Sequence, residues 1–447
     1  MLRASHRLYD KNKRRDLVLQ DRYGLDLTTT AVDARDAYVE GVDRILAGMP
    51  DVETPLNAAA SADPGFALPH AAIARQHQLS GRPKEARSAI EHAVSLAEGS
   101  TPRERQHVEI FHRLCTGKVP AALELTREHV QTYPRDALAL SPSCSVFGLI
   151  GFSGRVDREP EQLALLEPLA DAYGDDWWYL SSLAFALVEL GQWERGRKLI
   201  ERSLEQFPRN AVAAHIRAHA LYEAGEDDEA LAYLQGWLPD YDRGGLMHCH
   251  IWWHYCLLQM AGGDQAEAWR AYDANCAPSV SISPSINILT DGAALLWRSE
   301  LAGAERSNER WEALATYYET TFPRPMVFID AHAALAYAAL GRTDALQSYI
   351  EQAEELGLGG RLPAGTVGAT LSRAYGHFAA ERWGEAIEIL ETVMPEVVRI
   401  GGSRAQRDLM MNTLLAAYVK DGRASEAEAL LTSIEDRRPS RPVAGLS

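Results

Sequence analysis

Glycines recur along this chain at nearly regular intervals, and this is the feature that most restricts its fold. Eleven positions follow one another at spacings of 33 to 41 residues, ten of them glycine and one glutamate: Gly48, Gly81, Gly117, Gly154, Gly191, Gly225, Gly263, Gly303, Gly341, Glu381 and Gly422. Glycine is favoured where the chain must turn sharply after a helix. A turn that returns at this interval predicts about eleven copies of a two-helix unit.

The residues between these turns are typical of tetratricopeptide units, whose period is about 34 residues. In the clearest unit, 177–209, Leu180, Leu183 and Leu187 form one apolar stripe of a first helix, and Pro208 ends the second helix. No alternating segment of strand length occurs. The sequence therefore predicts an all-α, tetratricopeptide-like solenoid, curved so that its concave side forms a pocket. We expect an irregular lead-in over 1–30, a single array over 31–436 and a disordered tail over 437–447.

Composition excludes several classes of function. The net charge is −17, which argues against binding to nucleic acid or to an anionic membrane surface. No run approaches 18 apolar residues, and the first residues lack the apolar core of a signal peptide. The five cysteines are scattered, which fits a reducing compartment. We therefore expect a cytoplasmic protein. Phosphate-loop and dinucleotide-binding motifs are absent, so no nucleotide or flavin is expected. The oligomeric state stays open.

Two His-x-x-x-His pairs stand on the predicted first helices of consecutive units. His215 and His219 form the first pair and His250 and His254 the second, and Glu223 continues the first row by one more turn. Residues four apart share one helix face, and two imidazoles so placed can bind one metal ion. Zinc or iron is the divalent metal we expect. The same histidines also fit a polar ligand site without a metal, or core histidines bonded to the backbone.

Four other places contribute candidate site residues. Asp330 and His332 lie on the predicted first helix of a later unit. Asp330 is a candidate base and His332 a candidate metal ligand; alternatively, Asp330 is an acid at the start of that helix. Asp291 stands among apolar residues, either as a substrate contact or in an ion pair with Arg298. Ser403 and Gln406 predict a helix-capping box; the alternative sends Arg407 to an anionic ligand group. Trp178, Trp252 and Trp253 are expected to line the pocket.

Several longer motifs resemble the tetratricopeptide repeat protein 38 family over about residues 23–431. They are TPRERQHVE (101–109), VFGLIGFSGR (146–155), AHIRAHALYEAG (214–225), CHIWWHYCLL (249–258), TDGAALLWR (290–298), FIDAHAALAYAALGR (328–342) and GGSRAQRD (401–408). The resemblance implies a helical repeat protein and brings no assigned reaction with it.

These residues together predict a metal-dependent enzyme that acts on a small molecule or short peptide. We expect hydrolysis of an amide- or ester-like bond, with the metal polarising a carbonyl and Glu223 or Asp330 taking the proton. The alternative is a non-catalytic adaptor that binds a peptide or partner protein in its groove, as tetratricopeptide arrays often do.

Overall fold

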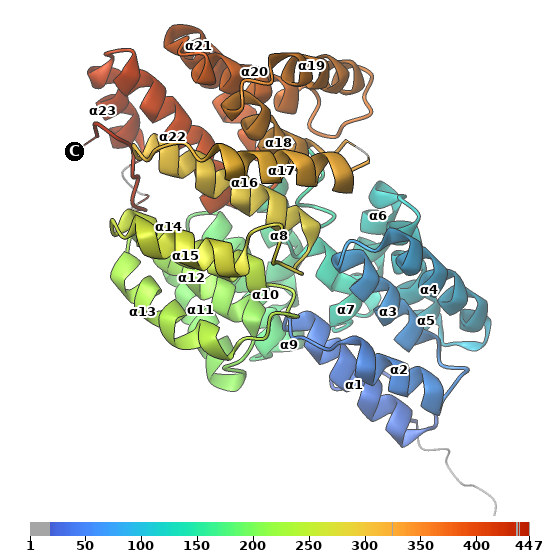
Figure 1. Cartoon of the computed structure of the whole chain (residues 1–447). Coiled ribbons are helices and arrows are strands. Elements are labelled where there is room, and N and C mark those ends of the chain that lie inside the picture. The colour runs from blue at the N-terminus through green and yellow to red at the C-terminus, as the bar shows by residue number, and fades with distance from the viewer. Residues whose placement is uncertain (1–17, 324, 435–436, 438, 447) are drawn as a thin grey trace, which may run out of the picture.

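The computed structural model describes residues 18–323, 325–434, 437 and 439–446, and the regular secondary structure of these residues is helical apart from one isolated β-bridge between Gln20 and Asp26. Helix pairs follow one another in a curved array (Figure 1). The predicted all-α, tetratricopeptide-like solenoid is thus confirmed. No helix in this part of the chain combines the length and apolar character that crossing a bilayer requires.

Ten of the repeating units are regular helix pairs. Their first helices are α1 (Val32–Leu46), α3 (Ala67–Leu79), α5 (Pro102–Cys115), α10 (Trp177–Glu189), α12 (Ala211–Ala224), α14 (His248–Ala261), α16 (Ser285–Leu301), α18 (Val327–Ala339), α20 (Val367–Ala379) and α22 (Arg404–Lys420). Their second helices are α2 (Glu53–Ala62), α4 (Pro83–Leu96), α6 (Val119–Thr132), α11 (Trp193–Gln206), α13 (Asp227–Trp237), α15 (Gln265–Asn275), α17 (Asn308–Thr321), α19 (Thr343–Leu358), α21 (Trp383–Val393) and α23 (Ala424–Ser433). An eleventh, irregular unit between α6 and α10 contains α7 (Ala137–Leu140), α8 (Arg158–Leu166) and α9 (Ala170–Tyr173).

The glycine series marks the turns of this array. All ten of its glycines have φ between 65° and 93°, the left-handed region that closes a helix, and Glu381 adopts it too at φ 59°. The two helices of a pair differ in burial. Every residue of α10 is buried, whereas α11 buries only Gly196, Ile200 and Ser203. First helices therefore form the inner layer, where any site must lie.

The array curls until its last hairpins touch its middle. Tyr222 on α12 donates to Asp408 on α22 at 2.8 Å, and Trp297 on α16 donates to Thr413 at 3.0 Å. The buried Arg158 guanidinium donates to the carbonyl of Gly402 at 2.6 Å. Figure 1 shows α22 beside α16 as a result. These bonds turn an open groove into a closed one.

The C-terminal strap, residues 437 and 439–446, differs from the predicted disordered tail. Arg437 donates to Glu223 at 2.7 and 2.9 Å and to Asp408 at 2.5 and 2.9 Å. Further along, the Ala444 amide donates to the Leu301 carbonyl at 2.8 Å, and Val443 is buried. The strap packs because it carries the cation that two buried carboxylates require. The predicted lead-in is irregular over 18–30, and its first 17 residues lie outside the described ones.

Candidate functional site

The four histidines lie on α12 and α14, the first helices of neighbouring units. Helix α12 begins at an Asn210 cap, whose side chain accepts from the Ala213 amide at 3.0 Å, and ends at Gly225 in the left-handed region. Alanines at 211, 213, 214, 218 and 220 are buried and let the neighbouring helices approach closely. The one-turn spacing then directs both pairs inward.

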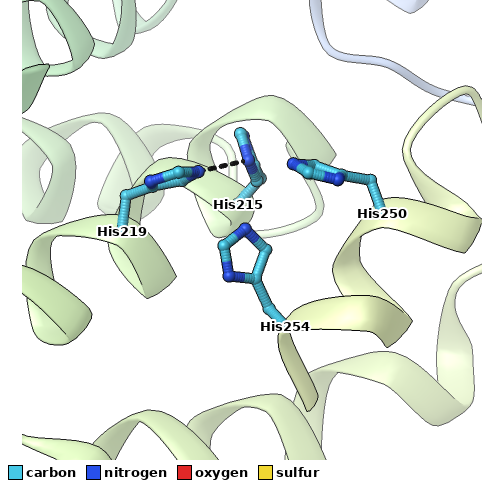
Figure 2. Close-up of side chains that lie close together, drawn as sticks. All are labelled: His215, His219, His250 and His254. Atoms are coloured by element: carbon cyan, nitrogen blue, oxygen red, sulfur yellow. Dashed lines mark hydrogen bonds between the residues drawn. The ribbon is translucent and has the colours of Figure 1, made fainter. Parts of the chain in front are cut away.

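The structure brings His215, His219, His250 and His254 together, and one ligand nitrogen from each lies within 4.8 Å of the others. Figure 2 shows the rings turned toward a common centre. The Nε2 atoms of His215 and His219 are 2.8 Å apart, so one donates its hydrogen to the other. Two nitrogens that bind one ion at about 2.0–2.1 Å each are at most about 4.2 Å apart. Small ring rotations are enough to close this set around an ion.

Three of these imidazoles, those of His215, His219 and His254, are neutral at physiological pH. Burial lowers the pKa of His219 to about 3, and His250 adds to the effect. Burial also lowers the pKa of His215 and His254 well below the usual value, and the neighbouring imidazoles reinforce it. Neutral imidazole is the form that binds metal. The Nε2 atom of His254 is buried without a hydrogen-bond partner in the described chain.

Two carboxylates lie behind the cluster, each beside the outer nitrogen of a different histidine ring. Asp291 on α16 accepts from His250 Nδ1 at 2.8 Å, which leaves Nε2 of that ring for the centre. Glu189, the last residue of α10, has Oε1 4.0 Å from His219 Nδ1. A carboxylate that accepts from a histidine, as Asp291 does, fixes the tautomer and orientation of a metal-binding ring, whereas Glu189 is too far from His219 for a hydrogen bond. Burial raises the pKa of Glu189 to about 7, against the opposing charge of Arg407.

A cavity of about 570 Å³ opens beside the cluster, and His215, His219 and His250 form part of its wall. Most of the remaining wall is apolar or aromatic, including Phe185 and the predicted Trp178. No aspartate or glutamate of the described chain lines it. This volume suits a small molecule rather than an extended chain.

Trp252 and Trp253 do not line the cavity. Trp253 is fully buried behind the cluster, and its ring stacks on His250 with centroids 5.2 Å apart. Trp252 points to the other side of α14, where its indole donates to His248 at 3.1 Å. The predicted substrate contacts at these two positions are therefore wrong for the cavity found. Adjacent residues of one helix cannot face the same side.

Two predicted bases lie away from the histidine centre, each held by other partners. Glu223 is buried in ion pairs with Arg437 at 2.7 Å and Arg404 at 3.4 Å. Asp330 accepts from Tyr318 at 2.9 Å and from the Met326 amide at 2.7 Å, which makes it an acid at a helix start. Neither residue lines the cavity, so the structure corrects both assignments.

The other three predicted residues also find structural roles. His332 donates from Nδ1 to the Phe328 carbonyl at 2.7 Å and is not one of the four converging histidines. Arg407 donates hydrogen bonds to Glu159 and to the Gly402 carbonyl.

The Ser403 capping box is confirmed, because the Gln406 side chain accepts from the Ser403 amide. Asp291 contacts His250 and not the cavity, and Arg298 donates to the Ala405 carbonyl instead of pairing with it.

Glu189 was missed, although the repeat register contains a signal for it. It lies two residues before Gly191, as Glu223 lies two residues before Gly225. Equivalent positions of neighbouring first helices lie side by side in a solenoid. Aligning the units would have placed Glu189 next to the His219 row.

No known protein-family model matches the chain. Among solved structures, the chain is similar to the human IFIT1 dimer with m7Gppp-AAAA (11% identity, 94% of this chain and 96% of that chain covered, TM-score 0.45). It is also similar to the Cut9–Hcn1 hetero-tetramer of the APC/C (12%, 90% and 85%, 0.38) and to yeast Tom70 (13%, 91% and 84%, 0.32). These are helical repeat proteins, and at such identities the likeness concerns the fold alone.

Proposed function

We propose that this protein binds a transition-metal ion through His215, His219, His250 and His254 and presents it to a small ligand in the adjoining cavity. The convergence of four buried imidazoles from the first helices of two consecutive units carries this proposal. Imidazoles placed only to fill a core need no common centre. The Asp291 carboxylate, which accepts from Nδ1 of the His250 ring, supports it further.

The ligand set bears on the choice between zinc and iron. Four imidazoles complete the tetrahedral shell of zinc and leave no position for water or substrate. A six-coordinate metal such as iron keeps two positions after binding the same four nitrogens. Iron is therefore the metal we propose for a catalytic site. Its chemistry there would be to polarise a substrate oxygen or to activate a bound water.

Hydrolysis of an amide- or ester-like bond stays a proposal in a weaker form. Glu223 and Asp330 bind other partners, and no carboxylate among the described residues lines the cavity, so this part of the chain supplies no acidic base to a ligand. This same observation favours the second candidate, a non-catalytic adaptor that holds a small molecule or short peptide end. A turnover assay separates the two, because only the enzyme converts its ligand.

The placement of the resembling stretches in the fold supports a family proposal. The stretches that resemble the tetratricopeptide repeat protein 38 family include α12, α14, α16 and the start of α22, which surround the histidine cluster. We propose membership in that family on this basis. The five cysteines are all unpaired, which supports the proposed cytoplasmic location.

Elemental analysis of untagged protein tests the metal proposal directly. One equivalent of iron is expected in the wild-type protein, whereas an equivalent of zinc would support the ion site and contradict the choice of iron. His219→Ala and His254→Ala should each lose the ion while circular dichroism stays helical. His92→Ala, an exposed histidine on α4, is the matched control and should keep the metal. Protein that takes up no metal after reconstitution with either ion would refute the proposal.

A further inference from the structure

A second polar group lines the same cavity on a different helix. Arg75 lies on α3, is 7% exposed and forms part of the cavity wall together with Gln78. Figure 1 shows α3 in the N-terminal part of the array, away from α12 and α14. The cavity therefore connects a guanidinium group in one region with the histidine cluster in another.

No carboxylate of the described chain pairs with Arg75. Its one side-chain partner is the neutral amide oxygen of Gln78, and its Nε atom is buried without a partner. Burial lowers the pKa of Arg75 to about 10, against an opposing effect of Cys115 and Cys144. The group still carries its charge at neutral pH.

Two other buried guanidinium groups, Arg103 and Arg158, donate to a carboxylate or to main-chain carbonyls, although Arg103 also has a buried Nε atom without a partner. Arg103 donates to Asp136 at 2.7 Å, and Arg158 donates to the carbonyls of Val398 and Gly402 at 2.8 and 2.6 Å. A buried cation without such a partner lowers stability, and structures keep one where a ligand supplies the opposite charge. Arg75 has the geometry of such a ligand contact because it faces the cavity.

We infer that the cavity binds an amphipathic organic anion, with its terminal carboxylate or phosphate on Arg75 and its apolar body along the aromatic wall toward the histidines. A planar guanidinium matches both anionic groups through paired hydrogen bonds. The apolar wall suits a hydrocarbon chain or ring system, and the absence of acidic residues from it avoids repulsion. This inference extends the proposed function to its ligand: the atoms presented to the metal would lie at a distance from the anionic end.

Calorimetric titration with decanoate, decyl phosphate and 1-decanol tests the inference and separates the two anionic groups. Decanoate or decyl phosphate should bind the wild-type protein more tightly than the neutral alcohol does. Arg75→Gln should weaken anion binding by at least roughly tenfold and leave decanol binding unchanged. Arg75→Lys keeps the charge and should restore part of the affinity. Arg87→Gln removes the same charge from an exposed position on α4 and should change nothing.

A stability measurement guards against a purely structural role for Arg75. Removing an unpaired buried charge should raise the melting temperature of ligand-free Arg75→Gln, whereas loss of a structural contact would lower it. Equal binding of decanoate by wild type and Arg75→Gln, or anions bound no better than decanol, would overturn the inference. His254→Ala should lose metal and retain anion binding, so the metal proposal can fail without this one.

Discussion

Asp291 accepts a hydrogen bond from His250 Nδ1 at 2.8 Å, and Asn287 and Gln406 donate to the same carboxylate at 3.3 and 3.4 Å. Three helices thus fix one imidazole ring. The carboxylate orients the ring and directs its other nitrogen to the centre.

Asp291→Asn should weaken metal binding by about 10- to 100-fold without loss of helical content, because the amide orients the ring less firmly. Competition with a chromophoric chelator measures this affinity. Asp344→Asn, an exposed acid on α19, serves as the control. Unchanged affinity in Asp291→Asn would contradict the role of this carboxylate behind the metal ligand.

His215, His219 and His254, whose pKa values are lowered by burial, should make the metal-free protein less stable in mild acid. Where the folded-state pKa lies below that of the unfolded chain, protons favour unfolding, so the free energy of unfolding falls as pH drops below about 6.5. Each such histidine contributes at most about 1.4 kcal/mol per pH unit. His254→Gln should reduce this slope, as measured by urea unfolding in chelator between pH 7.5 and 5. His92→Gln should retain the wild-type slope.

Glu381 occupies a turn that glycine occupies elsewhere in the series. A non-glycine residue at φ 59° lowers the free energy of unfolding by about 1–2 kcal/mol. Replacing it by glycine removes this strain but increases the conformational freedom of the unfolded chain, which offsets part of the gain. Glu381→Gly should therefore stabilise the protein by about 0.5–1 kcal/mol. Glu351→Gly in the middle of α19 should lose about 1 kcal/mol. Thermal unfolding of both variants gives the comparison, and destabilisation by Glu381→Gly would refute the argument.

Arg437→Gln should lower the free energy of unfolding by about 3–5 kcal/mol. It leaves Glu223 and Asp408, whose side chains are 1% and 2% exposed, without their main counter-charge. Arg361→Gln breaks the exposed pair with Glu355 and should cost less than about 1 kcal/mol. Chemical denaturation distinguishes the two magnitudes. A small effect at 437 would mean that the strap contributes little to the closed array.

Local sequence signals were enough to predict the fold and the core of the candidate site. The glycine series identified the turns because each turn needs a residue in the left-handed region, which favours glycine, and the turn repeats with each unit. The two histidine pairs converge because both lie on inner helices of neighbouring units, which sequence spacing reveals.

The misassigned residues depend on contacts that spacing does not reveal. Glu223 looks like a base until Arg437, 214 positions away, is placed beside it. Gln406 meets Asp291 across 115 positions because the array closes on itself. Closure depends on the summed rotation between units, and no single motif encodes that rotation. Arg75 gave no signal either, because an unpaired cation is recognised only when its neighbours are known.

The closure of the array also sets the order in which the site matures during synthesis. The four histidines lie within 40 residues of one another, so they leave the ribosome nearly together and their two helices can pack on a nascent chain. The cavity wall, by contrast, includes residues from Ile45 to Gln406 and stays incomplete until nearly the whole chain has been translated. A chain stalled before α22 would hold the histidine pairs and lack the side of the cavity wall that Ser403 and Gln406 form.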